Sequence, residues 1–248
     1  MYELVDADFV KGISDYKKCD ICPPEAENLN GIYVNPHGDG IICECKRNWK
    51  LLKRVERLLK ESGIPTLFWN FNLPKEYKNV DKALPEIITF ISNYKKAVEA
   101  GINLYLYGDK FTYKTRVAAY IGKMMMYFGY SVSYLTYVDC YTYIEKHRFS
   151  KEEEFAEDIH LLPLFNSQFL ILDDLPQMQL KSDSYPDKMI VSILKNRVQC
   201  CKNNIYISRF APKDLVFSED LKQIILNRTK TVHFEKQFVD NAVENFFG

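Results

Sequence analysis

A short apolar stretch followed by a turn and then by Lys-Thr constrains this chain more than any other part of its sequence. The stretch is LYLYGDKFTYKTRVA, from Leu104 to Ala118. A strand ending at Gly108, a loop and a helix beginning at Lys114 are typical of a phosphate-binding loop, where backbone N–H groups and the positive end of the helix dipole receive a polyphosphate. Lys114 adds positive charge, and the Thr115 hydroxyl can ligate Mg²⁺. We therefore expect a nucleotide site here.

The loop departs from the pattern G-x-x-x-x-G-K-[ST] at one position. Gly108 provides the first glycine, but Tyr113 stands where the second is expected. A side chain at position 113 narrows the approach of the backbone to a phosphate, which glycine leaves open. This limits the prediction of hydrolysis more than that of the fold. The loop residues expected to contact nucleotide are Gly108, Asp109, Lys110, Phe111, Thr112, Tyr113, Lys114, Thr115 and Arg116.

The length of the chain favours two units, and its hydropathy favours the absence of a membrane span. The 248 residues carry zero formal net charge, so any contact with nucleic acid must come from local basic patches. The N-terminus lacks a leader pattern, and no apolar run approaches the roughly 20 residues that span a bilayer. We expect a soluble, cytoplasmic protein. Scattered candidates for DNA contact are Lys110, Lys123, Arg148, Lys181, Lys195, Lys202, Tyr141 and Tyr143.

Four of the seven cysteines form two close pairs near the N-terminus, Cys19 with Cys22 and Cys43 with Cys45. A hairpin of two short strands around a turn rich in glycine and proline brings such pairs together. C-x-x-C and C-x-C pairs can then close a tetrahedral Zn²⁺ site. His37, in the turn, is an alternative ligand in place of Cys43 or Cys45. Four free, partly buried thiols are the simpler alternative.

The stretch from Lys46 to Ser62 predicts a basic amphipathic helix that links the two units, ended by Gly63-Ile-Pro. Its basic face is either a solvated surface or a contact for nucleic acid or a partner. We place the units at 1–62 and 63–248. Residues 64–82 are rich in aromatics and are expected to pack onto the second unit. The apolar face of the helix holds Trp49, Leu52, Val55 and Leu59.

Apolar segments and helical segments alternate along the second unit. This alternation predicts an α/β fold in which helices cover both faces of a parallel sheet, with ligands at the carboxyl ends of the strands. A further short helix is expected within residues 1–18. The expected strands are 103–107, 131–137, 169–172, 205–208 and 231–234, and the expected helices are 84–100, 114–128, 151–160, 187–200 and 219–227.

Two acidic residues follow the apolar run FLIL. Asp173, at the end of a strand that we expect to neighbour the phosphate loop, is placed to hold Mg²⁺. Asp174 is placed to orient or deprotonate an attacking water. A buried strand followed by a solvated turn gives the same pattern, but the phosphate loop upstream makes the pair more specific.

Polar residues after a later strand complete the candidate set. Ser208 and Arg209 stand where a polar side chain can sense the γ-phosphate, although Arg209 can instead face a neighbouring subunit, DNA or solvent. Arg228 is a candidate charge donated across a subunit interface, or it caps its helix. Arg197 is a third arginine to consider for a role between subunits.

With these residues in place, the chain resembles the DnaC/DnaI-type replicative helicase loaders and the related ATPase subunits of transposition systems, which belong to the AAA+ class. The resemblance covers nearly the full length. It implies an AAA+ P-loop NTPase domain of α/β class behind a small zinc-binding domain, with ATP, Mg²⁺ and Zn²⁺ as ligands. The motifs that carry it are C-x-x-C-P, C-x-C, SGIP, LYLYG with KT, LILDD, IYISRFAPKDL and ILNRT.

The resemblance also implies partners and residue roles. The zinc domain of the family grips a hexameric replicative helicase, and the AAA+ domain binds ATP and single-stranded DNA, often as a homo-oligomer. The sensor position, usually asparagine, corresponds to Ser208 and Arg209. The arginine finger corresponds to Ile224, one turn before Arg228. The implied ligands are Cys19, Cys22, Cys43 and Cys45 for zinc, Lys114 and Thr115 for phosphate and Mg²⁺, and Asp173 and Asp174 for Mg²⁺ and water.

Three functions fit these features. The first is an ATP-binding helicase loader in DNA replication, with weak or DNA-stimulated ATPase activity. The second is a helicase-binding decoy or inhibitor whose nucleotide site has decayed, and the third is the ATPase subunit of a transposition system. The divergent sequence would suit a phage- or plasmid-encoded loader acting in the host cytoplasm. Because of Tyr113 and Ile224, we expect ATP to act as a switch for assembly rather than as a rapidly consumed substrate.

Overall fold

The structure is a computed structural model. It describes residues 32–34, 40–42, 44–69, 71, 73, 83–146, 162–177 and 184–235. The helix expected within residues 1–18 and the charged helix expected at 151–160 lie outside the described residues. Among those that are described, no helix is long and apolar enough to cross a membrane.

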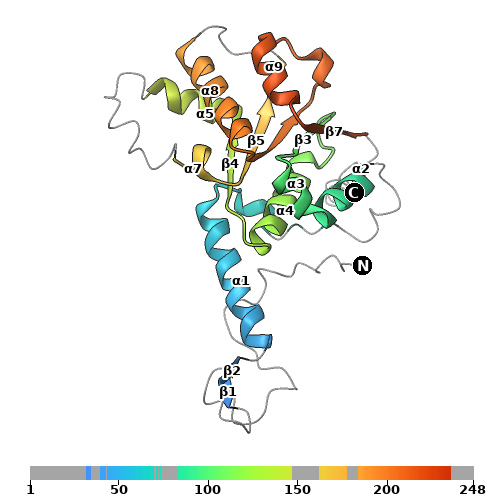
Figure 1. The fold of residues 1–248 in the computed structure, drawn as a ribbon. Helices are drawn as coiled ribbons and strands as arrows, with labels where there is room; N and C mark the ends of the chain where they lie inside the picture. The colour runs from blue at the N-terminus through green and yellow to red at the C-terminus, as the bar shows by residue number, and fades with distance from the viewer. Residues whose placement is uncertain are drawn as a thin grey trace, which may run out of the picture.

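A parallel sheet of five strands lies at the centre of the main body (Figure 1). All neighbouring strands pair in parallel, which confirms the predicted α/β fold with a parallel sheet. One expectation was wrong: the strand that carries Asp173 does not adjoin the phosphate-loop strand, because β6 lies between them. In sheet order the strands are β4 (Val132–Thr136), β5 (Phe169–Leu175), β6 (Asn203–Ser208), β3 (Asn103–Gly108) and β7 (Thr229–Phe234).

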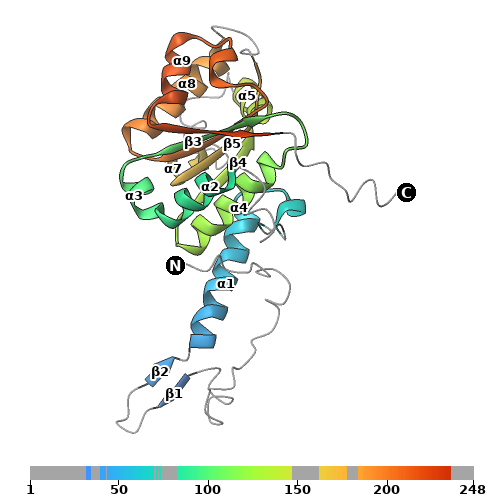
Figure 2. The same ribbon diagram turned by 90° about the vertical axis from the view of Figure 1, so that its right-hand side faces the viewer.

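Helices cover both faces of the sheet, as Figure 2 shows with the sheet edge-on. Successive strand residues point to opposite faces, so Leu104 and Leu106 join one hydrophobic core and Tyr105 joins the other. The first core packs α1 (Glu44–Glu61), α2 (Ala83–Ser92), α3 (Tyr94–Glu99) and α4 (Lys114–Tyr127). The second packs α5 (Tyr137–Lys146), α7 (Leu162–Asn166), α8 (Tyr185–Gln199) and α9 (Glu219–Leu226).

The single helix expected at 84–100 is two helices, α2 and α3, separated at Asn93. The Thr89 hydroxyl donates to the Pro85 carbonyl oxygen at 2.7 Å, and the Asn93 amide donates to the Thr89 carbonyl oxygen at 2.9 Å. Side chains that bond to the backbone in this way compete with helical hydrogen bonds and bend or end helices. Asn93 has φ −105° and ψ 24°, so it starts a new helix rather than continuing the first.

Helix α5 was not expected from the sequence, which placed only a strand before residue 147. Its start carries a reciprocal cap. The Asp139 backbone N–H donates to Thr136 Oγ1 at 3.0 Å, and the Thr136 hydroxyl donates to Asp139 Oδ2 at 2.6 Å. The spacing T-x-x-D was therefore a readable signal for a helix start.

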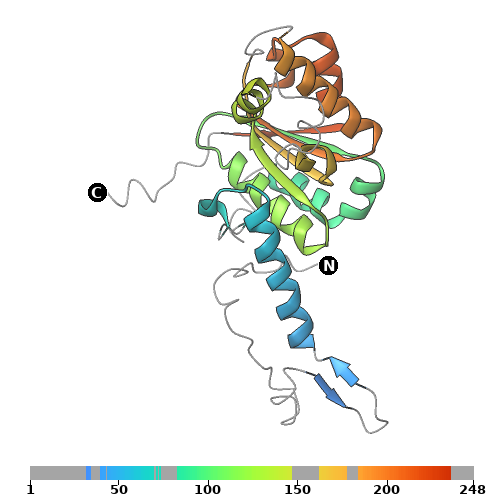
Figure 3. The same cartoon turned by 90° about the vertical axis from the view of Figure 1, so that its left-hand side faces the viewer.

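The linker helix α1 extends away from the sheet and carries the β1–β2 hairpin at its far end (Figures 1 and 3). The hairpin pairs β1 (Ile32–Val34) with β2 (Gly40–Ile42) in antiparallel register, which confirms the expected pair of strands. Val55 and Leu59 are buried in the first core, as their spacing predicted. Gly63 ends the helix with φ 78°, and a Cβ there would lie 2.7 Å from the Tyr134 carbonyl oxygen.

The described part of the aromatic segment after α1 packs onto the first core, as expected, while residues 70, 72 and 74–82 of that segment lie outside the described residues. Phe68, which lies in the 3₁₀ helix η2 (Thr66–Phe68), and Trp69 and Phe71 are partly buried against it. Lys123 of α4 donates hydrogen bonds to the carbonyl oxygens of Trp69, at 2.8 Å, and of Phe71. Lys123 is thus a buried tie between segments, and its proposed role in DNA contact was wrong.

Candidate nucleotide site

The phosphate loop connects the end of β3 to the start of α4. Gly108 has φ 144°, and a Cβ at this position would lie 2.1 Å from the Phe234 carbonyl oxygen, so only glycine fits. Two aromatic residues of the loop adopt left-handed backbone conformations, Phe111 with φ 62° and Tyr113 with φ 63°. This conformation costs an L-residue on the order of 1–2 kcal/mol, which glycine avoids. The loop thus follows the backbone path of a glycine-containing loop, and the backbone at Phe111 and Tyr113 is strained as a result.

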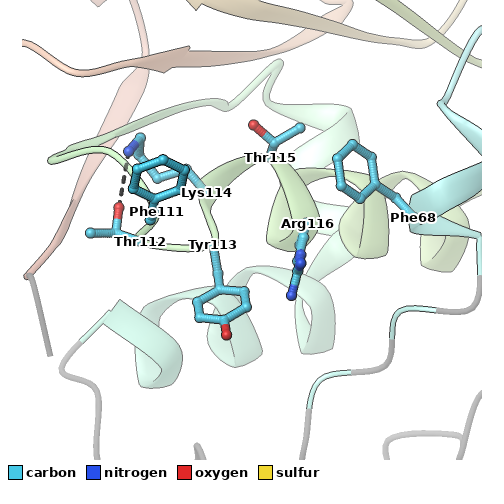
Figure 4. Close-up of a pocket in the computed structure, with 7 residues that line it drawn as sticks. All are labelled: Phe68, Phe111, Thr112, Tyr113, Lys114, Thr115 and Arg116. Atoms are coloured by element: carbon cyan, nitrogen blue, oxygen red, sulfur yellow. Dashed lines mark hydrogen bonds between the residues drawn. The ribbon is translucent and has the colours of Figure 1, made fainter. Parts of the chain in front are cut away.

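The Tyr113 side chain is held by contacts outside the phosphate side of the loop. Its ring stacks on Phe71 with centroids 6.4 Å apart, and the Arg116 guanidinium lies 4.7 Å from the ring centroid. In Figure 4 the ring points away from Thr115 and lies on the side of Arg116. These stacking and cation–π contacts offset part of the backbone strain.

Lys114 is turned onto the loop backbone. Its ammonium donates hydrogen bonds to the carbonyl oxygens of Gly108 (2.8 Å) and Asp109 (2.5 Å) and to Thr112 Oγ1 (2.9 Å). Burial lowers the pKa of Lys114 to about 8, although the Asp173 carboxylate opposes that shift. A buried cation whose partners are neutral carbonyls has a strong electrostatic preference for an incoming anion.

A bulge in β5 separates the two acidic residues. Leu172 pairs with Tyr206 and Leu175 pairs with Ser208, so β5 contains one more residue than β6 between these two pairs. Asp174 takes φ 53°. As a result the Asp173 side chain is buried, while that of Asp174 is 61% exposed. Bulges of this kind re-aim side chains next to functional sites.

Ser208 and Arg209 follow β6 and play different parts. The Ser208 hydroxyl is buried and donates to the Leu175 carbonyl oxygen at 2.9 Å, so it fastens the bulged strand. The Arg209 guanidinium lies 3.6 Å from Asp174 Oδ1 and is about half exposed. Arg209 therefore provides a partly exposed cation beside Asp174, on the same chain as the phosphate loop.

One cavity of about 530 Å³ brings the phosphate loop, the acidic strand and Arg209 together. Its size is within the range of small-molecule sites. A second cavity of about 210 Å³ also adjoins the loop, and Phe68, Tyr113 and Arg116 form part of its wall (Figure 4). The larger cavity is lined by Phe68, Lys110, Phe111, Lys114, Thr115, Tyr134, Thr136, Asp173, Asp174, Ile207, Ser208 and Arg209.

The oxygen donors of this cavity fit a magnesium ion. The Thr115 hydroxyl and the Asp173 carboxylate line the same space, and hard oxygen ligands are those that Mg²⁺ takes beside a nucleotide. The two Asp173 oxygens each accept one hydrogen bond, from Tyr134 and from the Asp174 backbone. A carboxylate accepts about four such bonds, so lone pairs remain for an ion or its waters.

The predicted zinc site lies almost wholly outside the described residues, which exclude Cys19, Cys22, His37 and Cys43. Cys45 falls in the first turn of α1, which begins at Glu44, two residues before the expected start. Within the ranges that the structure describes, no cluster of three or more metal-binding side chains occurs. The zinc site stays a prediction.

The other two arginines lie away from the cavity. Arg197 is fully buried and donates hydrogen bonds to Asn204 and to several backbone carbonyl oxygens, so its proposed role between subunits was wrong. Arg228 donates to the Ala100 carbonyl oxygen at 3.2 Å. It precedes β7 at the end of the sheet opposite to the loop, roughly 20 Å along the strands from the level of Gly108. A role for Arg228 across an interface stays a prediction.

Four residues that line the larger cavity were missed by sequence reasoning: Phe68, Tyr134, Thr136 and Ile207. The T-x-x-D spacing marked Thr136, but nothing local to the sequence marked the other three as site residues. Tyr134 reaches the site because β4 pairs with β5 beside Asp173, and Phe68 does so because the segment after α1 returns over α4.

No protein-family model matches this sequence, and no curated protein sequence matches it. Solved structures of similar fold include the DnaC helicase loader, with a TM-score of 0.54 and 19% identity over 68% of this chain and 99% of that one. DnaI follows with a TM-score of 0.52 and 18% identity over 69% and 95%. The chain has the fold of these proteins. The expected likeness to the DnaC/DnaI type is confirmed at the level of the fold.

The initiator DnaA has the same fold. The AMPPCP-bound DnaA of Aquifex aeolicus gives a TM-score of 0.53 and 19% identity over 74% of this chain. The match covers 53% of the DnaA chain, so the present chain corresponds to about half of that protein.

Proposed function

We propose that this protein is an ATP-binding helicase loader that engages a hexameric replicative helicase through its N-terminal region and delivers it to single-stranded DNA. The observation that carries the nucleotide part is the single cavity shared by Lys114, Thr115, Asp173, Asp174 and Arg209. The likeness of fold to the DnaC helicase loader, which extends over 99% of that chain, supports the replication part.

The residues of the cavity have complementary roles toward Mg²⁺-ATP. A polyphosphate would replace the loop carbonyl oxygens as the partner of the Lys114 ammonium. It would also accept hydrogen bonds from backbone N–H groups at the start of α4. Thr115 and Asp173 would hold Mg²⁺, which neutralises phosphate charge when bound. Asp174 would orient or deprotonate water. The Arg209 guanidinium, 3.6 Å from Asp174, is placed to exchange that carboxylate for a terminal phosphate.

The smaller cavity suits the base of the nucleotide. Phe68 and Tyr113 offer ring faces, and Arg116 offers a guanidinium plane. Purines stack on such groups without a need for base-specific hydrogen bonds. Aromatic residues in the loop therefore fit a site that gains affinity from stacking.

Nucleotide binding is tested with the full chain and a fluorescent ATP analogue in the presence of Mg²⁺. We expect the wild type to bind the analogue. Lys114→Ala should lose at least roughly tenfold in affinity, because Lys114 is the only buried cation among the described loop residues. Circular dichroism checks that the variant keeps its fold. A wild type that does not bind ATP contradicts the nucleotide part of the proposal.

Helicase binding is tested by pull-down of a purified hexameric replicative helicase on the full chain. We expect the double variant Cys19→Ser, Cys22→Ser and treatment with a chelator to abolish capture, because the zinc ligands organise the region that grips the helicase. The matched control is Cys200→Ser, Cys201→Ser, which removes two exposed cysteines of the AAA+ domain. Equal capture by both double variants contradicts the role of zinc.

A decoy that binds a helicase without turning over ATP is the second candidate. The strained aromatics Phe111 and Tyr113 and the presence of Ile224 in place of an arginine favour it. Measurement of phosphate release with and without single-stranded DNA separates the two. Steady release that DNA stimulates excludes the decoy, and binding without release supports it.

A further inference from the structure

Two buried tyrosines of the AAA+ domain donate hydrogen bonds to buried aspartates. The Tyr134 hydroxyl donates to Asp173 Oδ2 at 2.6 Å. The Tyr137 hydroxyl donates to Asp187 Oδ1 at 2.9 Å. The first pair lines the large cavity, whereas Tyr137 belongs to the second hydrophobic core, between α5 and α8. The same chemistry thus occurs once in the site and once away from it.

The Asp173 carboxylate is fixed through both of its oxygens. Oδ1 accepts the Asp174 backbone N–H at 2.7 Å, and Oδ2 accepts the Tyr134 hydroxyl. The hydrogen bond from the Asp174 backbone joins adjacent residues of the bulge, so it does not fix the carboxylate relative to another strand. The second comes from β4 and ties the carboxylate to a different strand. Together they set the plane of the carboxylate and therefore the direction of its remaining lone pairs.

The hydroxyl of Tyr134 is not needed to fill the core. Its ring packs in the first hydrophobic core, where a phenylalanine ring would pack equally. A buried polar group on an otherwise apolar ring, aimed at one carboxylate, has its effect on that carboxylate.

We propose that Tyr134 is a positioning residue that orients Asp173 for a divalent cation bound beside the phosphate loop. The proposal rests on the proposed nucleotide site. Hydrogen bonds to a ligating carboxylate tune metal affinity, and their loss typically costs 10–100-fold. Tyr134 acts through Asp173 and does not itself contact the cation.

The test compares Tyr134→Phe with Tyr137→Phe in the full chain. Each substitution removes a tyrosine hydroxyl that donates a hydrogen bond to a buried aspartate, so both variants should have a lower melting temperature than the wild type in the absence of nucleotide. Binding of a fluorescent ATP analogue is measured at fixed protein while Mg²⁺ is titrated, and again in EDTA. We expect Tyr134→Phe to raise the Mg²⁺ concentration for half-maximal binding by about tenfold. Tyr137→Phe should change it less than twofold, and binding in EDTA should be the same in both.

A double-mutant cycle with Asp173→Asn shows whether Tyr134 acts through Asp173. In that background we expect Tyr134→Phe to have no further effect on the Mg²⁺ midpoint. Equal Mg²⁺ midpoints in Tyr134→Phe, Tyr137→Phe and the wild type overturn this inference while the nucleotide site stands. Loss of the fold in Tyr134→Phe alone also overturns it, because the hydroxyl would then be structural. A wild type without Mg²⁺-dependent ATP binding overturns the inference together with the proposed function.

Discussion

Tyr113 adopts a left-handed backbone conformation, with φ 63°, at the position where a phosphate loop usually has glycine. The sequence indicated that a side chain here would narrow the approach of a phosphate. In the structure the ring lines only the smaller cavity, whereas Phe111 lines both. The main effect of Tyr113 is therefore backbone strain, and Phe111 is the loop aromatic that lines the larger cavity.

Replacement of Tyr113 tests that strain. Both Tyr113→Gly and Tyr113→Ala lose the contacts with Phe71 and Arg116, but only glycine relieves the left-handed conformation. We expect the glycine variant to be more stable than the alanine variant by about 1 kcal/mol, as measured by urea denaturation. Equal stability of the two variants would mean that the loop relaxes to another conformation when the ring is removed.

Lys114 makes nucleotide binding depend on pH. Burial lowers its pKa to about 8, so above pH 8 the ligand-free protein loses the ammonium charge. A bound polyphosphate favours the charged form, and binding then takes up a proton. We therefore expect ATP affinity to be constant below pH 7 and to fall by up to about tenfold per pH unit above pH 8.

Lys114→Arg is the matched control for this pH dependence. The guanidinium keeps its proton across the range from pH 7 to 9, so the variant should bind ATP with a flatter profile. Titration of a fluorescent ATP analogue at several pH values measures both proteins. Parallel profiles for the two would assign the pH dependence to another group.

At the scale of elements, the sequence predicted those helices and strands whose signals lie within a few neighbouring residues. The loop between β3 and α4, the amphipathic α1 and the strand FLIL were predicted because apolar spacing and turn residues act over a few positions. The break at Asn93 and the start of α5 at Thr136 depend on side chains that bond to the backbone, and only the second had a readable spacing. Local signals thus located elements better than they placed their ends.

Arg197 links α8 to β6 and to the segment before β5. Its guanidinium donates to Asn204 Oδ1 at 2.7 Å, to the carbonyl oxygens of Leu164 and Ser167 at 2.8 and 2.9 Å, and to that of Asn203 at 2.8 Å. Burial lowers the pKa of Arg197 to about 10, which leaves it charged at neutral pH. Such a buried cation is stable only while its acceptors surround it.

We expect Arg197→Lys to lower the free energy of unfolding by about 3–5 kcal/mol, because an ammonium cannot reach the acceptors that the planar guanidinium spans. Urea denaturation followed by circular dichroism measures the change. Arg209→Lys is the control, since an exposed arginine paired at 3.6 Å should cost less than about 1 kcal/mol. A small loss in Arg197→Lys would mean that water or a shifted α7 satisfies the acceptors.

At the scale of the whole molecule, α1 separates the hairpin from the five-stranded sheet and its helices, while two residues of its second half, Val55 and Leu59, are buried in the first core. Val55 and Leu59 pack in the same core as Leu104 and Leu106 of β3. Ser62 continues this link, because the Tyr134 backbone N–H donates to its carbonyl oxygen at 2.7 Å. A displacement of the end of α1 would therefore shift β4, the strand that carries Tyr134.

Nucleotide should drive self-association if the chain works as the proposed loader. We expect the sedimentation coefficient of the full chain to rise with AMPPCP and Mg²⁺, and Lys114→Ala to stay at the value of the nucleotide-free protein. In the assembled state, Arg228→Ala should lower ATP turnover without changing ATP affinity, as a charge donated across an interface does. A chain that sediments alike with and without nucleotide contradicts assembly by ATP.

The sequence by itself determined the class of fold and most members of the site. A glycine that no other residue can replace, a lysine and threonine at a helix start, and an aspartate pair after an apolar strand are local requirements, so they are visible in the chain order. They identified Gly108, Lys114, Thr115, Asp173 and Asp174.

Tertiary structure alone decided how these residues meet. Strand order placed β6 between β3 and β5, which brings Arg209 of the same chain next to Asp174. Strand pairing brought the Tyr134 hydroxyl to Asp173, and burial turned Arg197 from a candidate contact into a structural tie. These outcomes depend on contacts between residues far apart in the chain, for which local periodicity carries no signal.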